Sequence, residues 1–335
     1  MQAVVYTHSR QITEPDALID ATLPEPVPGA RDLLVEVRAI SVNPVDTKVR
    51  KRADPKGEQR VLGWDAAGVV RAVGAEVTLF RVGDEVFYAG SIARPGANSA
   101  LHCVDERIVG HKPKSLSFAE AAALPLTAIT AWEMLFDRLG LPRTPAEAGT
   151  LLIIGGAGGV GSIAIQLARV LTGARVIATA SRAETREWCA KLGAHDVIDH
   201  HGDMAAQVKA LGVAGIERIF CTNATDTHWA AMVRMLAPQG RIGIIDDPGP
   251  IDVRELKTKS ASLHWESMFV RSGFTTADML EQHKLLQEVA GLVDAGAIRT
   301  TLAENYGRIN AANVTRAHAA IESGRTRGKI VLEGF

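Results

Sequence analysis

Residues 150–169 read TLLIIGGAGGVGSIAIQLAR, and this stretch decides the fold. Its run of Leu and Ile is typical of a strand buried on both faces of a parallel sheet. A cluster of glycines follows, and then a segment whose polar residues, Ser162, Gln166 and Arg169, recur at helical spacing. So narrow a polar stripe predicts a mostly buried helix. The stretch therefore predicts a strand, a sharp turn and a helix.

Residues 156–161, GAGGVG, fit the pattern G-x-G-x-x-G. Between a strand and a helix, this pattern is typical of a dinucleotide site, because glycines let the chain turn sharply and let a pyrophosphate approach the backbone. Free N–H groups at the start of the helix would face the phosphates. We therefore expect Gly158, Gly159 and Val160 to contact a cofactor. A plain glycine turn is the alternative.

The end of the next predicted strand, residues 174–180, indicates which dinucleotide is bound. NAD sites usually carry an acid there, about 20 residues after the glycines, to bind the ribose 2′-hydroxyl. This chain has Ser181 and Arg182 instead. A carboxylate would repel a 2′-phosphate, whereas a hydroxyl and a guanidinium can bind one, so we predict NADPH. Ser181 also fits a capping box with Glu184, and both roles can coexist.

The composition is that of an ordinary globular protein. The chain has 335 residues, 47% of them hydrophobic and 22% charged, which is enough for two domains. A net charge of −1 gives no reason to expect a nucleic-acid partner. The three cysteines are far apart and fit a reducing cytosol. We see no signal peptide or membrane-spanning run, and expect a cytoplasmic protein.

The pattern of predicted secondary structure changes twice along the chain. Short strands bounded by glycine predict a β-rich, barrel-like domain up to about residue 120. From residue 150 to about 265, predicted strands alternate with helices, which indicates a doubly wound parallel sheet. The C-terminal part of the chain then returns to the pattern of the first 120 residues. We expect residues 1–122 and 272–335 to form one domain, into which a nucleotide-binding domain of residues 123–271 is inserted.

Two helix starts are predicted from their caps. Ser117 and Glu120 form an S-x-x-E capping box before an alanine-rich helix that Pro125 interrupts. Asp226 is expected to cap a helix that reaches Leu236. The other predicted strands cover residues 4–6, 33–40, 68–74, 84–90, 100–109, 196–198, 217–222, 241–245, 262–265 and 329–332, and the later helices cover 279–295 and 310–323.

Five motifs in this order resemble the medium-chain dehydrogenase/reductase superfamily, and most of all its zinc-free quinone oxidoreductase branch, which includes proteins labelled zinc-type alcohol dehydrogenase-like. They are SVNPVD at 41–46, GWDAAG at 63–68, LPLTA at 124–128, the glycine pattern, and GKIVL at 328–332. The resemblance covers nearly the whole chain. It implies an α/β fold in which a Rossmann sheet is inserted into a β-rich, GroES-like barrel domain.

The resemblance also indicates where a catalytic zinc would be bound. The zinc-using branch has a cysteine at the position of Asn43, a histidine at that of Trp64, and a third ligand near Leu126. None of these three can supply the Cys, His or carboxylate ligands that zinc needs, and Asp65 alone is not a site. The four-cysteine structural lobe is missing too. We therefore expect no metal.

Without a Lewis acid, oxidation of an alcohol is hard. Reduction of a quinone or an α,β-unsaturated carbonyl is easier, because the acceptor oxygen needs only a hydrogen-bond donor or water. The resemblance places Asn43 and Thr127 beside the nicotinamide, and Asn43 is the best candidate for the donor. Asn43 precedes Pro44, so it could instead cap a turn. We expect Asp46 to be solvated or salt-bridged.

Further site residues follow from the resemblance alone. The cofactor contacts are His200 near the 2′-phosphate, Asn223 and Ile245 after the fourth and fifth strands, Phe269 in a cofactor-facing loop, and Lys329 toward a phosphate. An ordinary surface position is the alternative for His200 and Lys329. Trp64, Trp265 and Phe269 are candidates for the wall of an apolar acceptor pocket, although aromatic residues more often fill cores.

Three functions remain open on the sequence. The leading one is an NADPH-dependent, metal-free reductase of a small-molecule quinone or enone. The others are a metal-free carbonyl reductase or alcohol dehydrogenase, and an NADPH-binding protein with little turnover. The resemblance also implies a homodimer.

Overall fold

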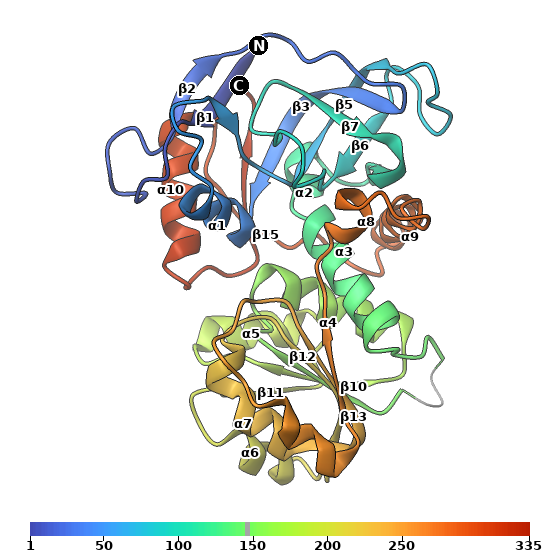
Figure 1. Cartoon of the computed structure of the whole chain (residues 1–335). Coiled ribbons are helices and arrows are strands. Elements are labelled where there is room, and N and C mark those ends of the chain that lie inside the picture. Colours follow the sequence, from blue (N-terminus) through green and yellow to red (C-terminus); the bar gives the residue numbers. More distant parts are fainter. Residues whose placement is uncertain (145–147) are drawn as a thin grey trace. The chain divides into compact units, whose positions relative to one another are not determined.

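The computed structural model describes residues 1–144 and 148–335 (Figure 1). The chain forms two compact units, which we call the first unit (Met1–Ile129 with Phe269–Phe335) and the second unit (Thr130–Met268). The chain therefore enters the second unit once and returns to the first. The boundaries expected from the sequence, 122/123 and 271/272, lie seven and three residues from these.

The second unit is built on a six-stranded parallel sheet in the order β11-β10-β9-β12-β13-β14. This order, in which the chain starts at the centre and winds to each side, confirms the predicted doubly wound sheet. Because all six strands run the same way, their carboxyl ends meet at one edge. The strands are β9 (Thr150–Ile154), β10 (Arg175–Thr179), β11 (Asp196–Ile198), β12 (Ile216–Cys221), β13 (Leu236–Ile244) and β14 (Ser262–Trp265).

Four helices connect and cover these strands. Helix α4 (Gly159–Leu171) packs on β9 and β10, and α5 (Ala183–Lys191) packs on β11. Helix α6 (Met204–Ala210) lies beside α7 (Thr225–Met235), which packs on β12 and β13. The apolar runs of the strands face these helices, which is why the strands contain so few polar residues. A π-helical turn (η2, Glu133–Arg138) and a 3₁₀ helix (η4, Val253–Lys259) complete the described part of this unit.

Helix α7 does not begin as expected. Its N-cap is Ala224, in the left-handed conformation with φ of 54°, so the predicted cap at Asp226 is wrong. The first N–H of the helix, that of Thr225, donates instead to the carboxylate of Asp246 at 2.9 Å. An acid from the end of β13, distant in sequence, thus replaces the local cap.

The first unit contains two sheets. One has the order β2-β1-β4, and the other has the order β15-β16-β3-β5-β6-β8, with β7 pairing on β3. The C-terminal strand β16 pairs antiparallel with β3, and this joins the two distant parts of the unit. The strands are β1 (Gln2–Tyr6), β2 (Ile19–Thr22), β3 (Asp32–Val42), β4 (Arg60–Val61), β5 (Ala66–Val73), β6 (Glu85–Tyr88), β7 (Leu101–Asp105), β8 (Val109–His111), β15 (Leu302–Asn305) and β16 (Lys329–Glu333).

Helices flank these sheets. The helix α1 (Pro44–Arg52), which the sequence analysis did not predict, lies beside α10 (Ala311–Glu322), as the blue and red ribbons of Figure 1 show. The predicted capping box is confirmed, since Ser117 and Glu120 exchange hydrogen bonds at the start of α2. The remaining helices are α2 (Phe118–Ala122), α3 (Pro125–Trp132), α8 (Val270–Gly273), α9 (Glu281–Asp294) and the 3₁₀ helix η1 (Glu106–Ile108).

Within the described ranges, no helix has both the length and the apolar content needed to cross a membrane.

Candidate functional site

The glycine turn lies at the carboxyl end of β9, and its glycines are required for different physical reasons. A Cβ on Gly161 would lie 2.3 Å from the carbonyl oxygen of Gly155, and a Cβ on Gly156 would lie 2.8 Å from the Cβ of Ala178. These two positions therefore need glycine for packing. A Cβ on Gly158 would meet only the Gly155 oxygen, at 3.5 Å. Gly158 thus leaves open space at the start of α4.

Helix α4 presents its N-terminus at this open space. Gly158 is its N-cap, and Gly159 and Val160 are half-buried residues of its first turn. The N–H groups of a first turn have no acceptor within the helix, and they form the positive end of its dipole. Thr179 at the end of β10 fixes the preceding turn, because its hydroxyl accepts from Gly155 N and its carbonyl accepts from Gly156 N, both at 3.1 Å.

The chain leaves β10 through Ser181, which is half-buried, and Arg182, which is exposed. The predicted capping box between Ser181 and Glu184 is wrong. Arg182 is the N-cap of α5, and Thr185 accepts its N–H at 3.2 Å. The Arg182 guanidinium lies 3.3 Å from the carboxylate of Glu184, with both side chains about half exposed, so the pair is weak and can be exchanged for another anion.

Three other predicted residues lie along the same edge of the sheet. The imidazole Nδ1 of His200 is 3.2 Å from the hydroxyl of Thr179. The side-chain oxygen of Asn223 would lie 2.5 Å from a Cβ on Gly155, which places the amide against the glycine turn. Ile245 follows β13 directly and is half-buried. The structure therefore brings the predicted residues of the second unit to one edge.

The first unit contains a buried polar network around Lys329. The Lys329 ammonium donates to Val42 O at 3.0 Å, to the side-chain oxygen of Asn43, and to the carboxylate of Asp65 at 3.0 Å. Lys329 is 3% exposed and Asp65 is fully buried. The surface alternative for Lys329 is therefore wrong. Its three protons all have acceptors in the chain, so none remains for the phosphate contact that the sequence suggested.

Asn43 is equally engaged in this network. Its Nδ2 donates to Asp65 at 3.0 Å and to Ser41 O at 3.4 Å, and the residue is 1% exposed. Asn43 is also the N-cap of α1, where its backbone N–H donates to the Asp46 carboxylate at 2.7 Å. The capping alternative thus holds for Asn43. Both amide protons of Asn43 are therefore in use within the chain.

The two carboxylates of the network are both buried. Asp65 also accepts from Leu126 N at 3.0 Å, at the start of α3. Burial raises the pKa of Asp65, while Lys329 and the hydrogen bonds from Asn43 and Leu126 oppose that rise. Asp46 was expected to be solvated or salt-bridged; it is 1% exposed, so the first of these alternatives is wrong. Burial raises the pKa of Asp46 to about 7, although Lys329 opposes that rise.

The network shows what the sequence analysis missed. Asp65 lies among apolar residues in GWDAAG, and this position marks a carboxylate that needs a buried partner. Thr127 lies close by in sequence to Leu126, is 2% exposed, and donates to Leu124 O at 3.0 Å. Its hydroxyl proton is therefore also used within the chain.

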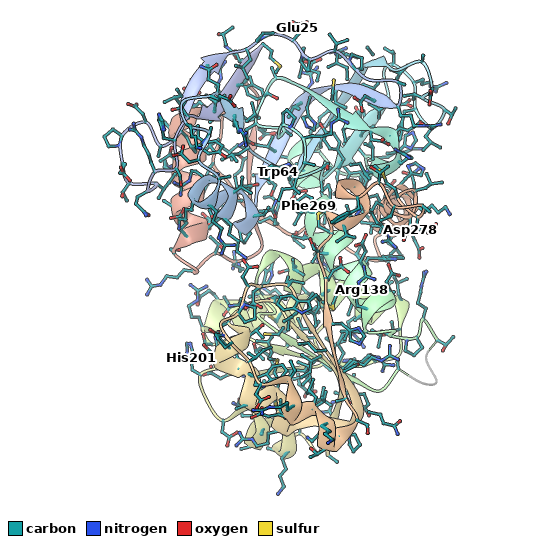
Figure 2. All side chains as sticks on the ribbon, in the orientation of Figure 1. Glu25, Trp64, Arg138, His201, Phe269 and Asp278 are labelled. Atoms are coloured by element: carbon teal, nitrogen blue, oxygen red, sulfur yellow. The ribbon has the colours of Figure 1, made fainter. Side chains whose placement is uncertain are left out.

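Two of the three predicted pocket aromatics meet in the first unit. The rings of Trp64 and Phe269 are 6.2 Å apart between centroids and 77° between planes, an edge-to-face contact (Figure 2). The indole N–H of Trp64 donates to Ser91 O at 3.0 Å. Trp265 belongs to the second unit, at the end of β14, and is 54% exposed. A pocket shared by all three stays a prediction.

These residues do not fit a zinc ion. Trp64 and Asn43 are hydrogen-bond donors where ligands would be needed, and the nearby carboxylate of Asp65 already holds the Lys329 ammonium. Across residues 1–144 and 148–335, no three His, Cys, Asp or Glu side chains are grouped so as to hold a metal ion.

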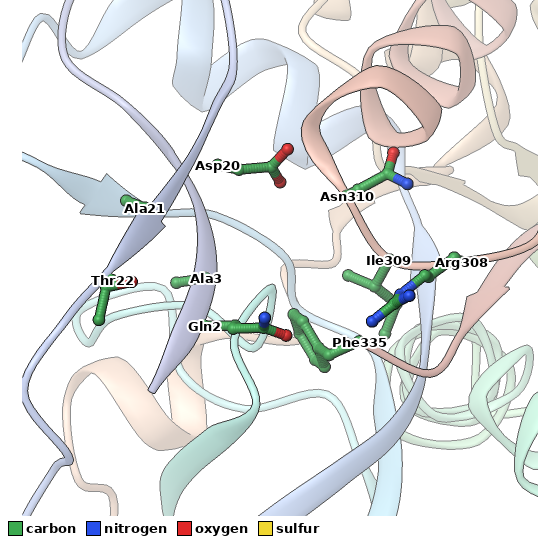
Figure 3. Close-up of a pocket in the computed structure, with 9 residues that line it drawn as sticks. All are labelled: Gln2, Ala3, Asp20, Ala21, Thr22, Arg308, Ile309, Asn310 and Phe335. Atoms are coloured by element: carbon green, nitrogen blue, oxygen red, sulfur yellow. The ribbon is translucent and has the colours of Figure 1, made fainter.

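A separate pocket of about 440 Å³ opens elsewhere in the first unit (Figure 3). None of its residues belongs to the predicted site, and its acid, Asp20, already accepts from Ala311 N at 2.8 Å, which makes it a cap for α10. The lining residues are Gln2, Ala3, Asp20, Ala21, Thr22, Arg308, Ile309, Asn310 and Phe335.

Two family models match the chain. The alcohol dehydrogenase GroES-like domain matches residues 29–133, and the zinc-binding dehydrogenase model matches residues 192–332. Together they span parts of both units, so the sheet of the second unit and the β-rich first unit each have a counterpart.

Known proteins of similar sequence and structure agree with these models. A zinc-type alcohol dehydrogenase-like protein of Staphylococcus aureus, SAS2087, is 42% identical over 92% of each chain. A candidate zinc-dependent alcohol dehydrogenase from Rhizobium etli has a TM-score of 0.97 and 56% identity, and the match covers 100% of this chain and 98% of the other. Escherichia coli quinone oxidoreductase in complex with NADPH has a TM-score of 0.83 and 26% identity, and the match covers 99% and 100%. The chain therefore belongs to the medium-chain dehydrogenase/reductase superfamily of oxidoreductases, among the zinc-type alcohol dehydrogenase-like proteins.

Proposed function

We propose that this protein is an NADPH-dependent, metal-free reductase whose acceptor is a quinone or an α,β-unsaturated carbonyl. The observation that carries the proposal is the open glycine turn beside an exposed arginine. Gly158 leaves room for a pyrophosphate at the N-terminus of α4, and Arg182 stands where an NAD site would have an acid. The similarity to a quinone oxidoreductase bound to NADPH supports the same cofactor.

The metal-free part of the proposal rests on the buried network. A zinc site needs ligands that carry negative charge or lone pairs and an open coordination position. The network offers an ammonium and two amide protons there, and all of them are donated to Asp65, to the Asn43 side-chain oxygen or to backbone oxygens. Lys329 and Asp65 therefore form a closed ion pair that would repel a second cation.

Each part of the chain has a separate role in this proposal. The N–H groups of Gly159 and Val160 bind the pyrophosphate, and Arg182 binds the 2′-phosphate. When bound, NADPH supplies the hydride. Lys329 holds the junction between β3 and α1 in place through Val42 and Asn43. The half-buried Phe269, which packs on the buried Trp64, offers an apolar surface to an electron-poor acceptor. The proton that completes the reduction comes from water in this scheme, because the Asn43 amide protons are engaged.

The test is stopped-flow measurement of NADPH oxidation with matched acceptors. Each enone is paired with the saturated ketone of the same skeleton, and quinones and aldehydes complete the panel. We expect rapid oxidation with quinones or enones and none with saturated ketones. Treatment with a chelator, followed by metal analysis of the protein, is expected to leave the rate unchanged.

Other outcomes would replace the proposal. Turnover of aldehydes alone would indicate a carbonyl reductase, and tight NADPH binding without turnover of any acceptor would indicate a binding protein. Activity that disappears with a chelator and returns with zinc would contradict the metal-free mechanism.

A further inference from the structure

Three histidines of the second unit gather at the carboxyl edge of its sheet. His200 and His201 follow β11, and His228 lies in the first part of α7. The ring of His200 lies 4.6 Å from that of His201 and 6.0 Å from that of His228, measured between centroids. His201 is exposed at the surface of this unit, as Figure 2 shows, while the other two are half-buried.

This cluster is connected to the glycine turn. Thr179, the last residue of β10, accepts a hydrogen bond from Gly155 N and lies 3.2 Å from His200 through the same hydroxyl. Strands β10 and β11 pair in parallel with Thr179 opposite Ile198, so the chains that follow them leave the sheet side by side. One of these chains carries Arg182 and the other carries His200.

The charged groups around the cluster leave the imidazoles without a full counter-charge. Burial lowers the pKa of His200 and of His228, and His201 lowers both further. The neighbouring acids oppose this lowering only in part: Asp199, which accepts from His201 N at 2.9 Å, raises the pKa of His200. Asp226 and Asp246 likewise raise the pKa of His228. The other charged groups at this edge are the Arg186 guanidinium, which donates to Ala180 O and Val197 O, and the Asp203–Arg234 pair between α6 and α7.

We infer that His201 and His228, together with His200, form a proton-dependent part of the 2′-phosphate site, so that selectivity for NADPH over NADH increases as the pH falls. This inference rests on the proposed function. In this inference, the 2′-phosphate of NADPH supplies the negative charge that balances the imidazoles. Each imidazole that faces the 2′-phosphate gains a proton when NADPH binds. The three rings are not grouped to hold a metal ion, in line with the same finding for all described residues.

The size of the effect follows from linkage. If binding takes up one proton, affinity rises by up to about tenfold for each pH unit that the pH falls between the two pKa values of the group. The 2′-phosphate itself has a second pKa of about 6, and its own protonation acts in the opposite direction. That contribution is the same for every variant of the protein, so differences between variants report the histidines.

The test uses isothermal titration calorimetry with two probes, adenosine 2′,5′-bisphosphate and 5′-AMP. Titrations are run in buffers of different ionisation enthalpy, which gives the number of protons taken up, at about pH 6 to pH 8. The variants are His201→Asn and His228→Asn. The matched control is His264→Asn, because His264 is on β14, at the opposite edge of the sheet from β11.

We expect the wild-type protein and the control variant to take up more protons with the bisphosphate than with AMP. The two cluster variants should take up fewer with the bisphosphate, lose several-fold in its affinity near pH 6, and keep their affinity for AMP. If a variant does not fold, NMR titration of the histidine ring protons of the wild-type protein, with and without bisphosphate, measures the same pKa rise directly.

Two failures can be told apart. If the bisphosphate binds no more tightly than AMP at any pH, the proposed NADPH dependence fails. If the bisphosphate is preferred but proton uptake is the same in the wild-type protein and the cluster variants, or if no ring titrates at a higher pH in its presence, the histidine inference is overturned and the proposed function stands.

Discussion

The glycine turn of the second unit and the Lys329 network of the first unit are built on opposite principles. The turn works through missing side chains: Gly158 leaves space, and backbone N–H groups supply the charge. The network works through side chains that fill their space and use each other's hydrogen-bonding groups, with Asn43 and Asp65 less than 2% exposed. The turn is prepared for a ligand, whereas the side-chain protons of Lys329 and Asn43 are already used within the chain.

This difference predicts how each region responds to mutation. A change in the network leaves a buried charge without its partner, which is costly to the folded state. A change at the open glycine leaves the fold intact and removes space for the ligand. Stability and cofactor affinity should therefore respond to different residues, and the four predictions below test that separation in order of decreasing effect.

Lys329→Met should destabilise the protein most, by about 3–5 kcal/mol, because it leaves the Asp65 carboxylate buried without its cation. The measurement is thermal and urea unfolding of the purified variant. Adding Asp65→Asn to Lys329→Met should recover part of the loss, since the uncompensated charge is then removed. A loss below about 1 kcal/mol for the single variant would mean that the ion pair is not closed as described.

Gly158→Ala should weaken NADPH binding by about 2 kcal/mol, roughly thirtyfold in Kd, with little change in unfolding temperature. The added methyl group meets only one backbone atom of the protein, at 3.5 Å, but it occupies the approach of the pyrophosphate. Gly161→Ala is the matched comparison. It places a Cβ at 2.3 Å from Gly155 O and should lower stability as well. Fluorescence titration measures the NADPH affinity of both variants, and calorimetry measures their unfolding temperatures. Equal unfolding temperatures for the two variants would contradict the prediction.

Arg182→Ala should weaken NADPH binding by about 1.5 kcal/mol, roughly tenfold, and leave NADH binding within about twofold of the wild-type value. The guanidinium is half exposed and its pair with Glu184 is weak, so stability should not change. The measurement is the Kd of NADPH and of NADH for the variant and for the wild-type protein, all in the same buffer. Equal weakening of the two would refute the 2′-phosphate assignment.

Asp46→Asn should change the pH dependence of stability. Burial raises the pKa of Asp46 to about 7, above the value near 4 of an unfolded aspartate, so the folded chain holds the proton that the unfolded chain releases. That stabilisation is present at low pH and is lost as the pH rises through 7. Between about pH 6 and pH 7, the variant should therefore lose about 1 kcal/mol less than the wild-type protein.

The control for this prediction is Asp252→Asn. Asp252 is exposed, and its hydrogen bonds with Arg254 lower its pKa to about 2, so it does not titrate in this range. Thermal unfolding at several pH values compares the three proteins. Parallel curves for all of them would show that Asp46 is ionised throughout.

The same contrast explains what could be predicted from the sequence. Strands β9 and β10 were predictable because each is a short apolar run followed by a turn and a helical segment, which is a local pattern. The turn was predictable because its function lies in its own residues. Helix α1 was missed, since DTKVRKR has no apolar stripe and the helix depends on its cap and on packing against α10.

The network could not be predicted, because its members are distant in the chain. Lys329 and Asn43 are separated by 286 residues, and no local pattern predicts that β16 pairs with β3 and brings the two side chains together. The predicted cap of α5 was wrong because neighbouring residues can fill the same positions. Arg182 is the N-cap in place of Ser181, and Thr185 accepts its N–H in place of Glu184. The Lys329 network and helix α1 thus depend on tertiary contacts, and the cap of α5 depends on which of several neighbouring residues makes the hydrogen bond.

Strand β16 brings Lys329 to Asp65 only after the whole second unit has been synthesised. During translation, Asp65 and Asn43 emerge from the ribosome long before the lysine that neutralises the pocket. The second unit has by then all of its own strands and is able to fold. Burial of Asp65 together with its cation is therefore possible only after β16 has been made, so the first unit completes its fold last.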